Sequence, residues 1–282
     1  MKVCVLSVCH NSYEESLVFL DSVSASVRGT GVEVELYFID NSARVDREFT
    51  TTLNELDLGY EVHYVRSDNL GYFPSIAAAV RRLGLSLAAY AYVIVSNVDL
   101  RFDSRFFAVL KESPVPKGVA ALAPSIQSSH LGVDRNPKIL RRPSGRKLRL
   151  NRWLFQHPLS HAALRTVSRF RLRAREVLRS ARAPTKARGR SSDVAIYAPH
   201  GSCVVLTREF VRREENITYP IFLFCEEIYI AEKARRFGLD IVYNPELVVY
   251  DDEHASTSLM MPKAYRKRNV EALSYVLDNY EF

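Results

Sequence analysis

Apolar runs recur along the first 100 residues of this chain, and an amphipathic stretch separates each run from the next. The runs are rich in β-branched residues and read KVCVLSVC, VEVELYFID, YEVHYVR and YVIVSN. Such runs are typical of strands covered on both faces. Helical periodicity over about 15–27, 46–56 and 74–91 lies between them. Strands that alternate with helices at this spacing predict an α/β fold, with a mostly parallel sheet and helices on both faces.

Polar clusters follow several of the predicted strands. They read His10-Asn11-Ser12, Asp40-Asn41-Ser42, Asp68-Asn69 and Asn97-Val98-Asp99. The carboxyl ends of parallel strands meet at one edge of a sheet, and ligands bind at that edge in open α/β folds. The sequence therefore predicts one polar crevice, to which several strands contribute.

The second half of the chain returns to this pattern after a basic segment. Strands are predicted at VAIYAP, SCVVL, GLDIVYNP and ELVVY, with helices over about 226–237 and 262–279. Between Arg135 and Arg190 there are 18 Lys or Arg and one acid, so this segment carries 18 − 1 = +17 and the rest 7 − 17 = −10. The stretch from Ser160 to Arg182 has the periodicity of a basic amphipathic helix. We expect an α/β half over 1–125, a basic, partly helical insertion over 126–192, and the other half of the same domain over 193–282.

Composition and motifs exclude several classes of protein. The 47% hydrophobic and 25% charged content is that of a soluble globular protein, and no apolar run reaches the ~20 residues of a membrane span. The four cysteines lack zinc-ligand spacing, and the first residues read as a strand rather than a signal peptide, so reduced thiols in the cytoplasm are expected. The motifs GxGxxG, GxxxxGK[ST] and GxSxG are absent, which argues against dinucleotide oxidoreductases, P-loop ATPases and α/β-hydrolases.

Motif order supplies a resemblance. The stretches VCHNS, IDNSARVD, DNLGYFPSIAAAV and YVIVSNVDLRF, followed by GSCVVL, FLFCEEIYIAEKARRFG and VVYDDEHAST, resemble family 2 glycosyltransferases of the GT-A fold. The pattern is most similar to rhamnosyltransferase-like members of O-antigen and capsule biosynthesis, and it covers nearly the whole chain except the basic segment. The resemblance implies an inverting, metal-dependent transfer of a sugar from dTDP-rhamnose or a UDP-hexose. The acceptor would be a lipid-linked oligosaccharide or a surface polysaccharide.

The resemblance also implies roles for acidic residues. Glu227 matches the usual catalytic base, and Glu226 would hold the acceptor, although acids in a first helical turn also stabilise the helix dipole. Asp99 would bind Mn²⁺ or Mg²⁺, for which carboxylates are preferred ligands. Only one acid remains here of the family's paired-acid motif. Asp251 falls on the family's His, so Asp251 and His254 are both candidates for a further metal ligand or a diphosphate contact.

The nucleotide-sugar would contact the strand-end clusters. The resemblance assigns Asp40 to the nucleotide base, since its carboxylate can accept from a pyrimidine N3–H. The other expected contacts are His10, Asn11, Asn41, Ser42, Asn69, Gly71, Asn97 and Gly201. Each of these residues is also an ordinary turn or cap residue, and that simpler interpretation stays open.

The basic segment has three interpretations: a solvated charge run, a nucleic-acid surface or a membrane surface. Aromatic residues for base stacking are sparse (Trp153, Phe155, Phe170), so no nucleic-acid partner is expected. A basic amphipathic helix suits anionic lipid head groups. We therefore expect residues 135–190 to dock on the inner face of the cell membrane, where a polyprenyl-diphosphate-linked acceptor is presented.

Two rival functions remain open. The first is a nucleotidyltransferase, which would require a Gly-rich loop with Lys or Arg after the first strand; His10-Asn11-Ser12 offers neither. The second is a non-catalytic, Arg-rich membrane or nucleic-acid adaptor on a degenerate transferase scaffold.

Overall fold

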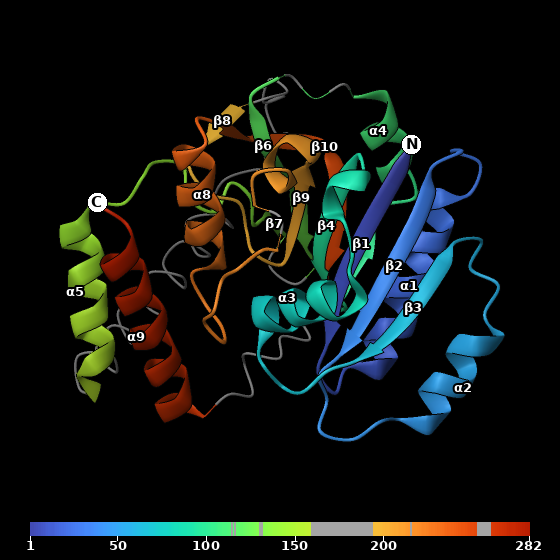
Figure 1. Ribbon diagram of the computed structural model, residues 1–282, viewed down its shortest axis with the longest axis horizontal. Helices are drawn as coiled ribbons and strands as arrows, with labels where there is room; N and C mark the ends of the chain where they lie inside the picture. Colours follow the sequence, from blue (N-terminus) through green and yellow to red (C-terminus); the bar gives the residue numbers. More distant parts are fainter. Residues whose placement is uncertain (114, 116, 130–131, 159–193, 215, 253–260) are drawn as a thin grey trace, which may run out of the picture. The chain divides into compact units, whose positions relative to one another are not determined.

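The computed structural model describes residues 1–113, 115, 117–129, 132–158, 194–214, 216–252 and 261–282 (Figure 1). Within these residues one ten-stranded sheet has the order β3-β2-β1-β4-β9-β6-β10-β5, with β7 paired to β6 and β8 paired to β10. The strands are β1 (Lys2–Cys9), β2 (Glu33–Asp40), β3 (Glu61–Arg66), β4 (Tyr92–Asn97), β5 (Leu100–Phe102), β6 (Val119–Ser128), β7 (Val133–Asp134), β8 (Val194–Ile196), β9 (Cys203–Thr207) and β10 (Asp240–Asp251).

Strand direction determines where the polar ends lie. β1 is parallel to both β2 and β4, and β2 is parallel to β3. β9 is antiparallel to its neighbours β4 and β6, and β10 is parallel to β6, so β6 and β10 run in the same direction as β1 to β4. The carboxyl ends of all these parallel strands therefore share one edge (Figure 1). The predicted mostly parallel α/β sheet is confirmed.

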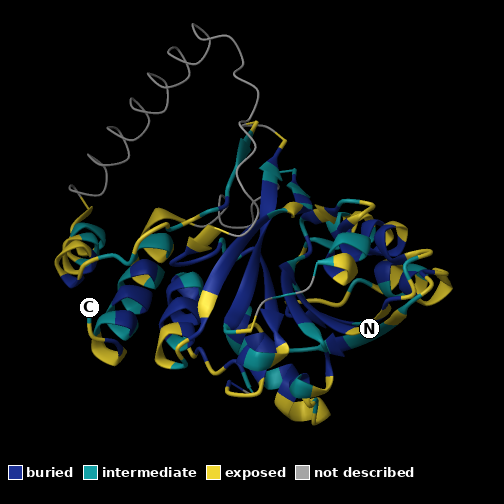
Figure 2. Cartoon of the chain, turned by 90° about the horizontal axis from the view of Figure 1, so that it is seen from above, coloured by how far each residue is buried: buried dark blue, intermediate teal, exposed yellow. Residues whose placement is uncertain are grey.

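Helices cover both faces of the sheet. α1 (Tyr13–Val27), α2 (Arg47–Glu55) and α4 (Phe106–Glu112) contribute to one buried apolar cluster with the strands. On the other face, Phe73 of α3 (Tyr72–Leu83) makes edge contacts with Tyr219 and with Tyr229 of α8 (Glu226–Arg236). The short helices η1 (Leu87–Ala89) and α7 (Arg208–Val211) complete this unit. Figure 2 shows the strands buried along most of their length, with exposed residues gathered on the outer faces of the helices.

Several elements differ from the prediction. The expected helix over 74–91 is broken, because Gly84 adopts a left-handed conformation (φ +62°) and ends α3 before η1 begins. The two strands expected over GLDIVYNP and ELVVY form one strand, β10, with a register shift near Asn244. β6 was not predicted, because the sequence VAALAPSIQS is Ala-rich and its strand pairing is decided by its neighbours β9 and β10.

The chain divides into two compact units. The first comprises Met1–Arg142 and Ser192–Leu259, and the second Pro143–Ser191 and Met260–Phe282. In the second unit α5 (Gly145–Gln156), which was not predicted, packs on α9 (Pro262–Asn279). Ser144 caps α5 by accepting from the backbone N–H of Lys147.

Some predictions concern residues outside this description. The helix expected from Ser160 to Arg182 and the candidate ligand His254 lie outside the described residues, and the domain boundaries at 125/126 and 192/193 stay a prediction. In the part of the chain that the structure describes, no helix is long and apolar enough to cross a membrane.

Gly71 fixes the approach of α3 to the loop before α8. Its φ is +98°, and a Cβ added there would lie 2.1 Å from the carbonyl oxygen of Phe222, which also accepts from the Tyr72 N–H at 2.9 Å. We expect Gly71→Ala to lower the free energy of unfolding by about 3 kcal/mol or more, because backbone strain and a backbone clash add. Gly59 has a φ of +70° and no atom within 4 Å of an added Cβ, so Gly59→Ala should cost only about 1 kcal/mol. Equal losses in denaturant titrations would contradict the role of the Phe222 contact.

Candidate functional site

The carboxylate of Asp40 is fully buried at the end of β2 and is enclosed by side chains from neighbouring strands and loops. Its Oδ2 accepts from the Tyr13 hydroxyl at 3.0 Å and from the Tyr64 hydroxyl at 2.5 Å, and it pairs with Arg66 Nη1 at 3.0 Å. Its Oδ1 accepts from the Ser42 N–H at 2.9 Å. In this arrangement Asp40 anchors the loop after β2. Both carboxylate oxygens of Asp40 already have partners within the protein. The predicted contact between Asp40 and a nucleotide base stays a prediction.

Hydrogen bonds join the loop after β1 to the loop after β2. His10 Nδ1 lies 3.2 Å from the Asn41 carbonyl oxygen, and the Asn11 N–H donates to Ser42 Oγ at 2.8 Å. Asn41 Nδ2 reaches the carbonyl oxygen of Gly71 at 3.2 Å, whereas its Oδ1 is buried without a partner. The structure thus brings together His10, Asn11, Asn41, Ser42 and Gly71 as the sequence predicted. An unpaired buried acceptor is costly, and it indicates a group that a ligand would satisfy.

The turn after β4 brings Asp99 to Asp251. β5 begins at Leu100 and pairs antiparallel with β10, so that Leu100 lies opposite Asp251. Burial first, and then the charge of Asp251, raise the pKa of Asp99 to about 6, despite the lowering effects of Asn97 and Arg135. The two carboxylates therefore lie near enough for their charges to interact at the ligand edge of the sheet.

Asp251 also has a cationic partner that the sequence analysis missed. Arg135 Nη1 lies 3.0 Å from Asp251 Oδ2, and the Asp251 side chain is only 8% exposed. Arg135 stood out in the sequence only as the first of many basic residues.

Two neighbouring carboxylates fit a hard divalent cation. Mg²⁺ and Mn²⁺ are commonly held by one or two carboxylates together with phosphate oxygens of the substrate. Among the described residues no group of three or more His, Cys, Asp or Glu side chains could hold a metal ion, so the remaining ligands would come from the substrate, water or residues beyond the description.

The two glutamates begin α8 after a strained turn. Phe224 and Cys225 have φ values of +76° and +64°, which non-glycine residues seldom adopt and which are found chiefly where function requires them. Glu226 is buried and its Oε1 has no partner; burial first, then the charge of Glu227, raise its pKa to about 8. Burial also raises the pKa of Glu227, and the charge of Lys138 opposes this.

Glu227 lies beside the turn that precedes β9. A Cβ added at Gly201 would be 3.8 Å from Glu227 Oε2, and the Asn97 N–H donates to the Ser202 carbonyl at 2.8 Å. Asn97, Gly201 and Glu227 are therefore neighbours, as a single site requires.

Tyr72 is a second residue that the sequence analysis did not single out. Its hydroxyl is buried without a partner, and burial first, then the charges of Cys203, Glu226 and Asp99, raise its pKa well above the usual value. The signal in the sequence was its position directly after Gly71, within the stretch DNLGYFPSIAAAV that carries the resemblance.

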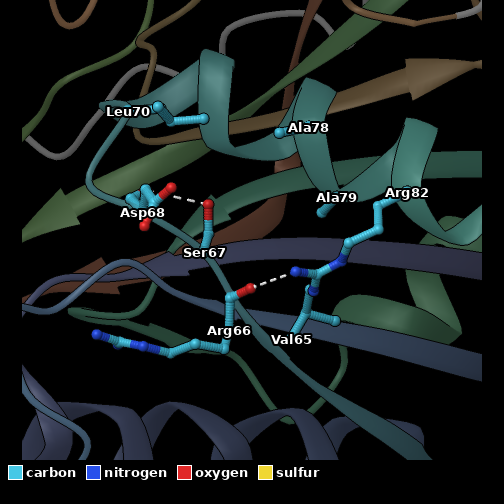
Figure 3. A pocket seen from close by; sticks show the side chains of 8 residues that line it. All are labelled: Val65, Arg66, Ser67, Asp68, Leu70, Ala78, Ala79 and Arg82. Atoms are coloured by element: carbon cyan, nitrogen blue, oxygen red, sulfur yellow. Dashed lines mark hydrogen bonds between the residues drawn. The ribbon is translucent and has the colours of Figure 1, made fainter.

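A surface hollow of about 330 Å³ lies at the end of β3 against α3 (Figure 3). Arg82 crosses it to donate to the Arg66 carbonyl oxygen at 2.7 Å, and Ser67 Oγ donates to the Asp68 carbonyl oxygen at 3.0 Å. The predicted residue Asn69 is exposed and follows this segment. None of the carboxylates of Asp99, Asp251, Glu226 and Glu227 lines this hollow.

Comparisons with known proteins find similarity in fold. No family model matches this sequence, and no curated protein matches it. TarS from S. aureus in complex with UDP-GlcNAc matches with a TM-score of 0.57 and 11% identity, over 100% of this chain and 68% of that chain. The mannosyltransferase PcManGT from Pyrobaculum calidifontis in complex with GDP-Man and Mn²⁺ matches with a TM-score of 0.53 and 13% identity, over 98% of this chain and 72% of that chain.

A third solved structure extends the likeness. GalNAc-T7 with UDP, GalNAc and Mn²⁺ matches at a TM-score of 0.57 and 12% identity, over 97% of this chain and 48% of that chain. The chain therefore has the GT-A glycosyltransferase fold that the sequence predicted. At these identities the likeness shows the fold alone, and the rhamnosyltransferase-like subgroup stays a prediction.

Glu226 should make folding stability depend on pH. The pKa of Glu226 is raised from 4.5 to about 8, so the folded state binds its proton more tightly than the unfolded state does. This difference in proton binding stabilises the folded state below pH 4.5, and the stabilisation is lost as the pH rises toward 8. We expect Glu226→Gln to abolish this loss, so that at pH 8 the variant is more stable than the wild type by about 1–3 kcal/mol. Denaturant titrations at pH 5 and pH 8 measure the difference.

Glu232 on the same helix is the matched control. Burial acts to raise its pKa, but hydrogen bonds from Arg142 at 2.8 Å and from Tyr197 at 2.7 Å lower it overall. Glu232→Gln should therefore destabilise the protein at pH 8, opposite in sign to Glu226→Gln. A Glu226→Gln variant less stable than the wild type at pH 8 would show that Glu226 is paired and ionised.

Proposed function

We propose that the protein is an inverting, metal-dependent glycosyltransferase that moves a sugar from a nucleoside-diphosphate-sugar to an acceptor hydroxyl. The observation that carries this proposal is the pair of electrostatically coupled carboxylates, Asp99 and Asp251, at the ligand edge of a GT-A sheet. The solved structures with the same fold are bound to UDP-GlcNAc, to GDP-Man and Mn²⁺, or to UDP, GalNAc and Mn²⁺. A nucleotidyltransferase has no comparable support.

Glu227 is the proposed catalytic base. Inverting transfer needs a carboxylate that accepts the proton of the acceptor hydroxyl as that oxygen attacks the anomeric carbon. Burial raises the pKa of Glu227, which makes the ionised carboxylate a stronger base than an exposed glutamate. Glu226, with an unpaired and buried Oε1, would hold a sugar hydroxyl.

Asp99 and Asp251 would hold the cation, Mn²⁺ or Mg²⁺. Bound there, the ion would neutralise charge on the leaving nucleoside diphosphate. His254 stays a candidate further ligand outside the described residues. The loops that carry His10, Asn11, Asn41 and Ser42 would contact the nucleotide, together with Asp40, Asn69, Gly71, Asn97 and Gly201.

The donor and acceptor follow from the sequence resemblance. We propose dTDP-rhamnose or a UDP-hexose as donor, and a polyprenyl-diphosphate-linked saccharide or surface polysaccharide of the O-antigen or capsule type as acceptor.

Nucleotide titration tests the proposal directly. Calorimetric titrations of UDP, dTDP, GDP and CDP, each with and without Mn²⁺ or Mg²⁺, should show metal-dependent binding of one diphosphate. Asp99→Ala should weaken that binding about tenfold or more, because a carboxylate ligand of the cation is lost. Metal-independent binding that is equal in the variant would remove Asp99 from its role. Absence of any nucleotide binding would favour the Arg-rich adaptor.

Glu227→Gln separates chemistry from binding. Loss of the base should lower kcat by about 100- to 10,000-fold while the Kd of the nucleoside diphosphate stays unchanged. If this variant keeps its turnover and Glu226→Gln loses it, then Glu226 is the base.

We also propose that the second unit docks on an anionic membrane surface. α5 carries Arg146, Lys147, Arg149 and Arg152 and no acid. Leu150 and Trp153 are 55% and 48% exposed, and at helical spacing they share one face with Arg146 and Arg149. Exposed apolar side chains between cations suit the boundary between lipid head groups and acyl chains. The enzyme would then act at the inner face of the cell membrane.

Vesicle sedimentation tests this docking. The protein should bind vesicles that contain phosphatidylglycerol and not vesicles of pure phosphatidylcholine, with ~1 kcal/mol for each cation near the surface. Leu150→Ser should weaken the binding about threefold to tenfold through lost apolar burial. Leu83 of α3 is 42% exposed, so Leu83→Ser is the matched control and should bind as the wild type does. Equal binding to both kinds of vesicle would contradict the proposal.

A further inference from the structure

Arg135 is held rigidly at the ligand edge of the sheet. Its backbone N–H donates to the Ile126 carbonyl oxygen at 2.9 Å, in the hairpin that joins β6 and β7. The residue before Arg135, Asp134, accepts from the Tyr243 hydroxyl at 2.5 Å. The residue after it, Asn136, donates from its side chain to the Pro124 carbonyl oxygen and accepts from the His200 N–H, each at 2.7 Å. The backbone around Arg135 is therefore fixed.

The guanidinium of Arg135 interacts with both carboxylates of the proposed cation site. It contacts Asp251 at 3.0 Å, and its positive charge lowers the pKa of Asp99 against the effects of burial and of Asp251. The Arg135 side chain is 24% exposed and that of Asp251 is 8% exposed, so the pair is only partly screened by water.

Binding of a divalent cation would reverse the sign of the net charge of these three side chains, from −1 to +1. Asp99 and Asp251 supply two negative charges, and Arg135 already supplies one positive charge. A divalent cation on the same carboxylates would leave a surplus positive charge at the site. Arginine binds phosphate oxygens through paired N–H donors, and a diphosphate is the anionic part of the proposed substrate.

We propose that Arg135 is a diphosphate-binding residue that competes with the divalent cation for Asp251. Without a cation it pairs with Asp251; when a cation takes that carboxylate, the guanidinium turns to the diphosphate of the donor. This inference rests on the proposed function. It adds that the Arg135 guanidinium supplies a positive charge to the leaving nucleoside diphosphate.

Binding of Mn²⁺ to the nucleotide-free protein tests the competition. Arg135→Gln should bind Mn²⁺ about fivefold to tenfold more tightly than the wild type, because a charged hydrogen bond no longer occupies Asp251. Most damaging substitutions weaken ligand binding, so tighter binding distinguishes competition from a structural defect. Electron paramagnetic resonance of free Mn²⁺ measures the affinity, and circular dichroism checks that the variant is folded. Unchanged or weaker Mn²⁺ binding overturns the proposal.

Nucleotide binding tests the second half. With saturating Mn²⁺, Arg135→Gln should bind the diphosphate selected from UDP, dTDP, GDP and CDP about tenfold more weakly, through loss of a charged contact. Arg135→Lys keeps the positive charge but lacks the paired N–H donors, so its affinity for the diphosphate should lie between those of the wild type and Arg135→Gln. Lys117 is exposed and precedes β6 at the opposite edge of the sheet, so Lys117→Gln controls for loss of one charge.

The outcomes separate this inference from the proposed function. Diphosphate affinity that is unchanged in Arg135→Gln, or lowered equally by Lys117→Gln, overturns the role of Arg135 while the transferase stands. If the wild type binds none of the four diphosphates, the proposed function fails and the diphosphate role fails with it. The Mn²⁺ titration needs no nucleotide and reports on the Arg135–Asp251 pair in either case.

Discussion

The parallel pairing of β1 with β2 on one side and β4 on the other is the constraint on which the rest of the site depends. The hydrogen bonds of these pairs hold the strands in one direction, so that Cys9 lies opposite Asp40 and Val8 opposite Asn97. β9 then runs the other way between β4 and β6, which lets β10 end at the same edge. Without that inserted strand, Asp251 would not meet Leu100 and the turn that carries Asp99.

Uncompensated polar groups are concentrated at this edge. Burial disfavours the charged forms of Asp99 and Glu226, and so does repulsion from Asp251 and from Glu227, respectively. Asn41, Tyr72 and Glu226 each bury a polar atom that has no hydrogen-bond partner. Such groups lower the stability of a fold, and the backbone strain before α8 lowers it further. The large apolar core elsewhere offsets these costs. An edge arranged this way is prepared to bind a ligand that brings its own cation and hydroxyl groups.

Much of this edge was predictable, and the reason is local. A run of β-branched residues followed by Asp-Asn-Ser or Asn-Val-Asp identifies both a strand and the polar group at its end. The partners of those groups were not predictable. Asp40 is enclosed by Tyr13 at the start of α1 and by Tyr64 and Arg66 of β3, and no local pattern links these two elements to the end of β2. The Ala-rich β6 was missed because its own residues do not favour a strand over a helix.

The sequence by itself determined the alternation of strands and helices and the polar residues at the strand ends. These depend on side-chain period and backbone freedom, which are properties of neighbouring residues. Only the tertiary structure decided that Asp99 comes near Asp251 and that Arg135 interacts with both. That arrangement depends on the register of β5 against β10 and on the β6–β7 hairpin. Register between distant strands is set by hydrogen bonding and packing across the whole sheet, and no local run of residues encodes it.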